Sequence, residues 1–202
     1  SASAMTRLLS AQEKQLNIYM PVRLGDFIYA LTTPGVEPLV PQVTLEKQGQ
    51  KMVPTLKGTA VFKGQKMVGA LNENESTGYR RMHPKVMQGG LVIIPSPIDQ
   101  EGKVTLELIR SRAQTEAIIS GNDISMQIKI QAEGNFYEQN FTGPVLTPKN
   151  IKKMEKLASQ EISRQCYACV SKAQTLNSDI FGWGRIIESS SPQSWKQLEK
   201  TW

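Results

Sequence analysis

The residues best suited to chemistry are the two cysteines of the chain, Cys166 and Cys169, which stand three positions apart. A redox pair normally occupies a helix N-terminus, where the helix dipole lowers the thiol pKa, and a zinc site needs four ligands. This pair falls in the middle of a long helical pattern, and the only histidine, His83, is far away in sequence. We therefore interpret the cysteines as two small buried apolar residues.

Other arrangements for catalysis or cofactor binding are scarce. A single histidine excludes most Ser-His and Cys-His pairs, and His83 stands before Pro84, as expected of a linker residue. The segment Gly58–Lys66 lacks the spacing of a phosphate-binding loop, and helix capping accounts for Glu73 and Glu75. We expect no catalytic residue, no metal site and no cofactor, and we interpret the protein as a non-enzyme.

A cluster of four lysines has a possible binding role. Lys149, Lys152, Lys153 and Lys156 occupy the first turns of the predicted long helix, where the helix macrodipole disfavours cations. Two interpretations remain open, a solvated helix face and a surface that contacts an anionic membrane or an acidic partner. Nucleic acid is not an expected partner, because no aromatic residues are interleaved with the lysines.

The second candidate region is the aromatic and glycine-rich stretch that follows the long helix. Its two bulky rings alternate with glycines, which let other backbone approach closely. Aromatic packing against a sheet and a protein-binding surface are both open interpretations. The residues concerned are Asp179, which we interpret as a helix N-cap, Phe181, Gly182, Trp183, Gly184 and Trp195.

These residues depend on a long C-terminal helix for their position. Thr147 can cap this helix, and Pro148 suits its first position, where the missing N–H costs nothing. Apolar residues then recur with helical spacing as far as Leu176, and a shorter helix is predicted within the stretch that begins at Asp179. The apolar positions are Ile151, Met154, Leu157, Ala158, Ile162, Cys166, Cys169, Val170, Ala173 and Leu176.

The rest of the chain predicts strands and a few short helices. Before the long helix, strands are predicted at Leu91–Ile94, Val104–Ile109, Thr115–Ser120 and Ile124–Ala132, and a hairpin turn at Gly121-Asn122-Asp123 favours antiparallel pairing. Further upstream, the expected elements are a helix over Ala4–Asn17, a short strand at Val22, a helix over Leu24–Leu31, strands at Val40–Glu46, Thr55–Phe62 and Lys66–Leu71, and a short helix after Asn72.

Together these elements predict an α+β fold in which an antiparallel-rich sheet packs against the long C-terminal helix, preceded by a smaller mixed α+β domain. We place the domain boundary near Lys85, beside the Pro84 and Gly89-Gly90 breaks, so the predicted domains are residues 1–85 and 86–202. The net charge of +6 favours acidic partners, and no apolar run approaches the ~20 residues of a membrane span.

Several motifs in a fixed order resemble the C-subunit lipoproteins of spore germinant receptors, the germination protein C family. The Gly-Thr-Ala-Val-Phe and Asp-Ile-Phe-Gly-Trp-Gly segments contribute most to the resemblance, which extends along most of the chain. The matching pieces are Phe27–Leu31, Pro34-Gly35, Pro41, Lys57–Lys63, Met67–Leu71, Gly90–Pro95, Lys103–Ser111 and Ser178–Gly184, followed by Pro192 and Trp195.

The resemblance implies a non-enzymatic receptor subunit needed for nutrient-triggered germination and acting through protein contacts. Members of the family lie on the outer face of the spore inner membrane, held by a lipid anchor, beside integral membrane A and B subunits. Because no signal peptide or anchor cysteine is present, the chain resembles a soluble fragment that lacks most of an N-terminal domain. A module that binds the nutrient itself is the alternative.

Overall fold

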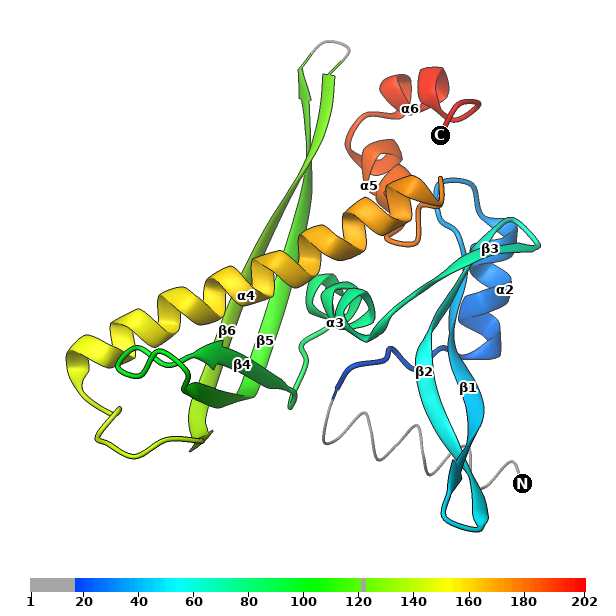
Figure 1. Cartoon of the computed structure of the whole chain (residues 1–202). Helices are drawn as coiled ribbons and strands as arrows, with labels where there is room; N and C mark the ends of the chain where they lie inside the picture. Colours follow the sequence, from blue (N-terminus) through cyan, green and yellow to red (C-terminus); the bar gives the residue numbers. More distant parts are fainter. Residues whose placement is uncertain (1–16, 121–122) are drawn as a thin grey trace.

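The computed structural model describes residues 17–120 and 123–202, which form an α+β protein with two three-stranded antiparallel sheets (Figure 1). The strand orders are β1-β2-β3 and β4-β5-β6. The helix predicted over residues 4–17 and the turn centred on residues 121–122 lie outside the described residues, apart from Asn17. The elements are α2 (Leu24–Thr32), β1 (Leu39–Gln48), β2 (Lys51–Lys63), β3 (Lys66–Leu71), α3 (Glu73–Met82), β4 (Leu91–Pro95), β5 (Lys103–Ser120), β6 (Asp123–Gln139), α4 (Pro148–Thr175), α5 (Trp183–Ser190) and α6 (Pro192–Leu198).

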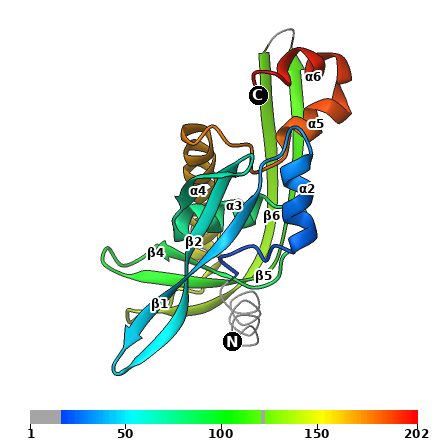
Figure 2. The same cartoon turned by 90° about the vertical axis from the view of Figure 1, so that its right-hand side faces the viewer.

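The first sheet forms where the sequence predicts strands, and a tight turn between Lys63 and Lys66 joins β2 to β3. No strand forms at Val22. Helix α2 lies alongside this sheet (Figures 1 and 2) and contacts it through Phe27, whose ring meets Phe62 edge to face at 5.3 Å. The apolar side chains of α2 are only partly used for packing, because Leu24 is 75% and Ile28 49% exposed.

Helix α3 connects the two sheets and packs against α4 (Figure 1). Asn72 caps it by accepting a hydrogen bond from the Glu75 backbone N–H, while the Glu75 carboxylate accepts from the Asn72 N–H. Gly78 permits the close crossing of the helices, since a Cβ at this position would lie 2.1 Å from the Gln165 carbonyl oxygen. One hydrophobic core includes Val61 of the first sheet and Val104 of the second. The division of the chain near Lys85 stays a prediction.

The second sheet contains longer strands than the sequence predicts. The strands predicted at Val104–Ile109 and Thr115–Ser120 are one continuous strand, β5, which pairs with β6 along almost its whole length. The polar segment that separates them in sequence, Arg110–Gln114, is paired with Lys129–Glu133. Backbone hydrogen bonds to β6 therefore hold this segment in an extended conformation. A search for alternating apolar residues cannot detect such a strand, because the segment is polar.

Helix α4 begins as predicted, with the Thr147 hydroxyl accepting a hydrogen bond from the Asn150 N–H and Pro148 in the first turn. It packs against α3 and β4, and its buried residues include Met154, Ile162 and both cysteines. Within the described ranges, no helix is both long and apolar enough to cross a bilayer.

Candidate functional site

The segment that follows α4 is fixed to the first sheet as soon as it leaves the helix. The Ser178 hydroxyl donates to the Phe62 carbonyl at 2.6 Å, and the Glu37 backbone N–H donates to the Asp179 carbonyl at 2.8 Å. Glu37 itself accepts from the Gly64 N–H at 2.6 Å and pairs with Lys63 at 3.5 Å. The end of α4 is therefore joined to both β2 and the loop before β1.

The Asp179 carboxylate organises this region by accepting three hydrogen bonds. The donors are the Trp183 N–H at 3.1 Å, the Gly184 N–H at 2.8 Å and the Trp202 indole N–H at 2.8 Å. Asp179 was expected to be a helix N-cap, but the N-cap position of α5 belongs to Gly182. The carboxylate nevertheless reaches the first N–H groups of α5, which have no partner within the helix and favour a negative charge.

The two glycines of the motif are required for different reasons. Gly182 has a φ of +70°, a left-handed conformation that other L-residues adopt at a cost. Gly184 lies against the loop before β1, so that a Cβ at this position would come within 2.6 Å of the Gly35 Cα and 2.7 Å of the Trp195 ring. Gly184 is thus a close-packing position, whereas Gly182 serves the turn.

The aromatic residues divide into two groups. Phe181 stacks on Trp183 at 4.4 Å and lies 5.8 Å from the Tyr79 ring, and both stacked residues remain partly exposed. Trp195 is buried and meets Trp202 edge to face at 5.9 Å. We call Asp179, Phe181, Gly182, Trp183, Gly184, Trp195 and Trp202, together with Gly35, the C-terminal junction.

All six predicted residues of the motif lie in this junction, and the sequence reasoning missed the partner roles of Gly35 and Trp202. Gly35 was singled out only as part of the Pro34-Gly35 piece of the family resemblance, and nothing in its immediate sequence points to Gly184. Whether the junction also contacts a partner protein stays a prediction.

The lysine cluster lies at the opposite end of α4. All four lysines are exposed and occupy neighbouring positions on the helix, at spacings of three and four residues. The first turn contains no acidic residue, and no ion pair joins these lysines to a carboxylate in the described part of the chain. Two large apolar side chains near the same end of α4, Leu146 and Ile151, are also exposed and border the groove between α4 and the second sheet.

The groups that might perform chemistry are held in unreactive states. Burial raises the pKa of the Cys166 thiol to about 11 and also raises that of Cys169, so both remain protonated at neutral pH. Desolvation, reinforced by Arg80 and Lys85, lowers the pKa of His83 to about 4 and keeps its imidazole neutral. Among the residues that the structure describes, no three His, Cys, Asp or Glu side chains gather as a metal site.

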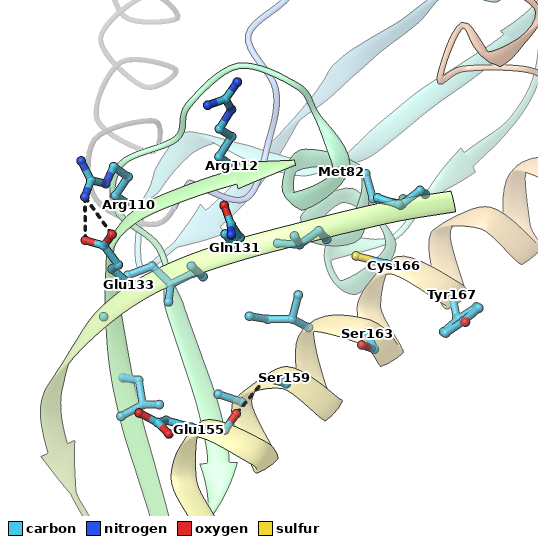
Figure 3. Close-up of a pocket in the computed structure, with 18 of the residues that line it drawn as sticks. Met82, Arg110, Arg112, Gln131, Glu133, Glu155, Ser159, Ser163, Cys166 and Tyr167 are labelled. Atoms are coloured by element: carbon cyan, nitrogen blue, oxygen red, sulfur yellow. Dashed lines mark hydrogen bonds and ion pairs between the residues drawn. The ribbon is translucent and has the colours of Figure 1, made fainter. Parts of the chain in front are cut away.

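A large groove of about 1630 Å³ lies between α4 and the β5–β6 strands. Ser159, Ser163 and Cys166 line it from α4 (Figure 3). Ile128 and Ile130 line it from β6, and Arg110, Glu133 and Glu155 are among the charged residues of its lining. Helix α4 and strand β6 supply most of its apolar residues.

The chain is similar to known proteins both in sequence and in fold. The family model described as "Spore germination B3/GerAC like, C-terminal" matches residues 57–202. The chain is 27% identical to spore germination protein YndF of Bacillus subtilis (strain 168) over 150 residues, which cover 72% of this chain and 36% of YndF. It is 24% identical to YfkR of the same organism, also described as a spore germination protein, over 90% of this chain and 48% of YfkR.

The crystal structure of the GerBC protein has the same fold, with a TM-score of 0.75 and 20% sequence identity. The match covers 92% of this chain and 56% of the GerBC chain. The chain spans between about a third and a half of the length of the two curated relatives.

Proposed function

Because the chain belongs to the spore germination B3/GerAC-like, C-terminal family, we propose that it acts in spore germination as a non-enzymatic subunit of a nutrient germinant receptor. It works through contacts with the integral membrane A and B subunits, at the outer face of the spore inner membrane, where a lipid anchor holds the full-length protein. The family match and the GerBC-like fold support this role.

The observation that favours protein contacts is the exposed apolar surface of α2. None of its nine residues is buried, and Leu24, Ile28 and Tyr29 are 75%, 49% and 54% exposed. Leu24 and Ile28 are four positions apart, so their side chains are neighbours on one face of the helix. An exposed apolar surface of this kind typically marks a protein-binding site.

Replacing both Leu24 and Ile28 by serine is expected to reduce co-purification with the membrane subunits roughly tenfold or more, because central apolar contacts dominate interface energies. The measurement is the yield of the A and B subunits recovered with the tagged protein. Leu45→Ser with Met52→Ser is the matched control, since these side chains are equally exposed on the β1–β2 hairpin. Unchanged recovery with the α2 variant, at unchanged unfolding midpoint, would contradict the proposed contact.

The lysine cluster is proposed to face the anionic membrane surface. Its four exposed ammonium groups share one face of α4, with no acidic residue in the first turn, so they can bind lipid phosphates together.

Replacing all four clustered lysines by glutamine is expected to weaken binding to vesicles of anionic phospholipid roughly 100-fold or more, because each basic residue near the surface contributes about 1 kcal/mol. Vesicle co-sedimentation at low and physiological salt measures the effect. The control replaces Lys47, Lys51, Lys57 and Lys66, which are also exposed and carry the same total charge. If both variants lost the same amount of vesicle binding, the net charge of the protein alone would explain its attraction to the vesicles. That result would refute a membrane-facing role for the lysine cluster.

Direct binding of the nutrient is the alternative function. Calorimetric titration of the protein with candidate amino acids and sugars distinguishes nutrient binding from a role in protein contacts alone. A subunit that acts only through protein contacts gives no heat of binding with any of these compounds.

A further inference from the structure

Strand β6 forms an edge of the second sheet. It pairs with β5 on one side, and no other strand in the described residues pairs with its opposite side. An edge strand of this length offers a row of unpaired backbone N–H and C=O groups for another strand. The edge adjoins the groove beside α4, so a strand added there would also cover apolar side chains.

The two faces of β6 differ in chemistry between Met126 and Phe136. The face toward the groove carries Met126, Ile128, Ile130, Ala132, Gly134 and Phe136. The opposite face carries Gln127, Lys129, Gln131, Glu133 and Asn135, of which Gln131, Glu133 and Asn135 also border the groove. Figure 3 shows the Arg110–Glu133 ion pair and Arg112 across the strands from α4, and all three residues also line the groove.

We propose that the occupant of this edge is a second copy of the chain, paired β6 to β6 in antiparallel orientation about a two-fold axis at Gln131. On the polar face this register places Lys129 opposite Glu133 of the second copy, twice by symmetry, and Gln127 opposite Asn135. On the groove face it places Ile130 opposite Ala132 and Ile128 opposite Gly134.

This register is selected by charge and by size. With the axis at Lys129 two ammonium groups face each other, and with the axis at Glu133 two carboxylates do, which is unfavourable for directly opposed residues. With the axis at Gln131 each charge meets its opposite, and each isoleucine meets a small residue. Lys129 has no ion-pair partner in the described part of the chain. Glu133 is paired with Arg110, and both side chains of this ion pair are exposed to solvent.

The axis position gives a direct cross-linking test. Gln131 lies opposite its own copy, and Cα atoms of opposed residues in antiparallel strands are about 4.5–5.5 Å apart, within the range of a disulfide. Gln131→Cys is therefore expected to form a covalent dimer under mild oxidation. Gln127→Cys is the matched control, because it is equally exposed and would lie on the order of 26 Å from its copy along the strands.

Charge reversal tests the register independently. The unmodified chain is expected to form a particle of twice its 22.5 kDa mass in light scattering and sedimentation at high concentration. Lys129→Glu or Glu133→Lys alone should weaken self-association roughly tenfold or more, whereas the double variant should restore it. Lys51→Glu, with the same change of charge on the other sheet, should leave self-association unchanged.

A chain that stays monomeric at every concentration overturns the proposal. So does a dimer that cross-links through Gln127→Cys as readily as through Gln131→Cys, or one that the double charge reversal does not restore. Because Cys166 and Cys169 are buried, a cross-link in the unsubstituted chain would also count against it, by showing a different contact.

Discussion

Replacing Asp179 by alanine is expected to lower the free energy of unfolding by roughly 3 kcal/mol, because loss of a helix-capping side chain and of an indole partner both add to the cost. The substitution removes the acceptor for the Trp183 and Gly184 N–H groups and for the Trp202 indole at the same time. The first two bonds begin α5, and the third holds the final tryptophan against the junction. Urea unfolding measures the stability change, and near-UV circular dichroism reports the release of Trp202.

Two further variants separate the role of the carboxylate from a general effect of losing charge. Asp179→Asn keeps one acceptor oxygen, so its cost should fall between those of the unsubstituted chain and Asp179→Ala. Glu116→Ala removes an exposed carboxylate from β5 and should change stability by less than about 0.5 kcal/mol. If Asp179→Ala cost no more than Glu116→Ala, the three hydrogen bonds would have no energetic importance.

Gly78→Ala is expected to destabilise the protein by about 3 kcal/mol, at the upper end of the range for overpacked sites. The new methyl group would lie 2.1 Å from the Gln165 carbonyl oxygen and 2.6 Å from its carbonyl carbon. Both atoms belong to the backbone of α4 and cannot move aside as a flexible side chain can. Helices α3 and α4 would therefore have to separate, which disturbs the core around Cys166.

The matched control is Gly25→Ala, which lies in α2 with no atom within 4 Å of the added methyl group. Alanine favours helix over glycine by about 1 kcal/mol, so this variant should be as stable as the unsubstituted chain or more stable. Denaturant unfolding of both variants gives the comparison. Similar behaviour of the two glycine variants would mean that the helices do not approach as closely at Gly78 as described.

The sequence reveals most elements of the fold through local signals. Thr147 and Pro148 mark the start of α4, and Lys63-Gly-Gln marks the tight turn between β2 and β3. The continuity of β5 was missed, because Arg110–Gln114 has no apolar alternation and is extended only through its pairing with β6. A partner strand, rather than the local sequence, determines its conformation.

The sequence analysis identified the residues of the candidate site but not the contacts that these residues make with other parts of the chain. Asp179 was interpreted as a helix N-cap, a position that Gly182 occupies, although the Asp179 carboxylate does accept from the first N–H groups of α5. Its third partner, Trp202, depends on how α6 folds back. The contact between Gly35 and Gly184 joins the two ends of the described chain, and no periodicity or spacing predicts it. The exposure of Leu24 and Ile28 likewise depends on tertiary structure, since the same spacing equally suits a buried helix.

The continuous helix α4 gives the molecule a mechanical property. Its 28 residues form a rod roughly 42 Å long, with the lysine cluster near one end and the C-terminal junction at the other. The backbone crossing at Gly78 and Gln165 lies nearer the junction than the lysine end. The helix therefore sets a fixed spacing between the lysine cluster and the junction, and the first sheet is bound to the junction end through Glu37 and Phe62.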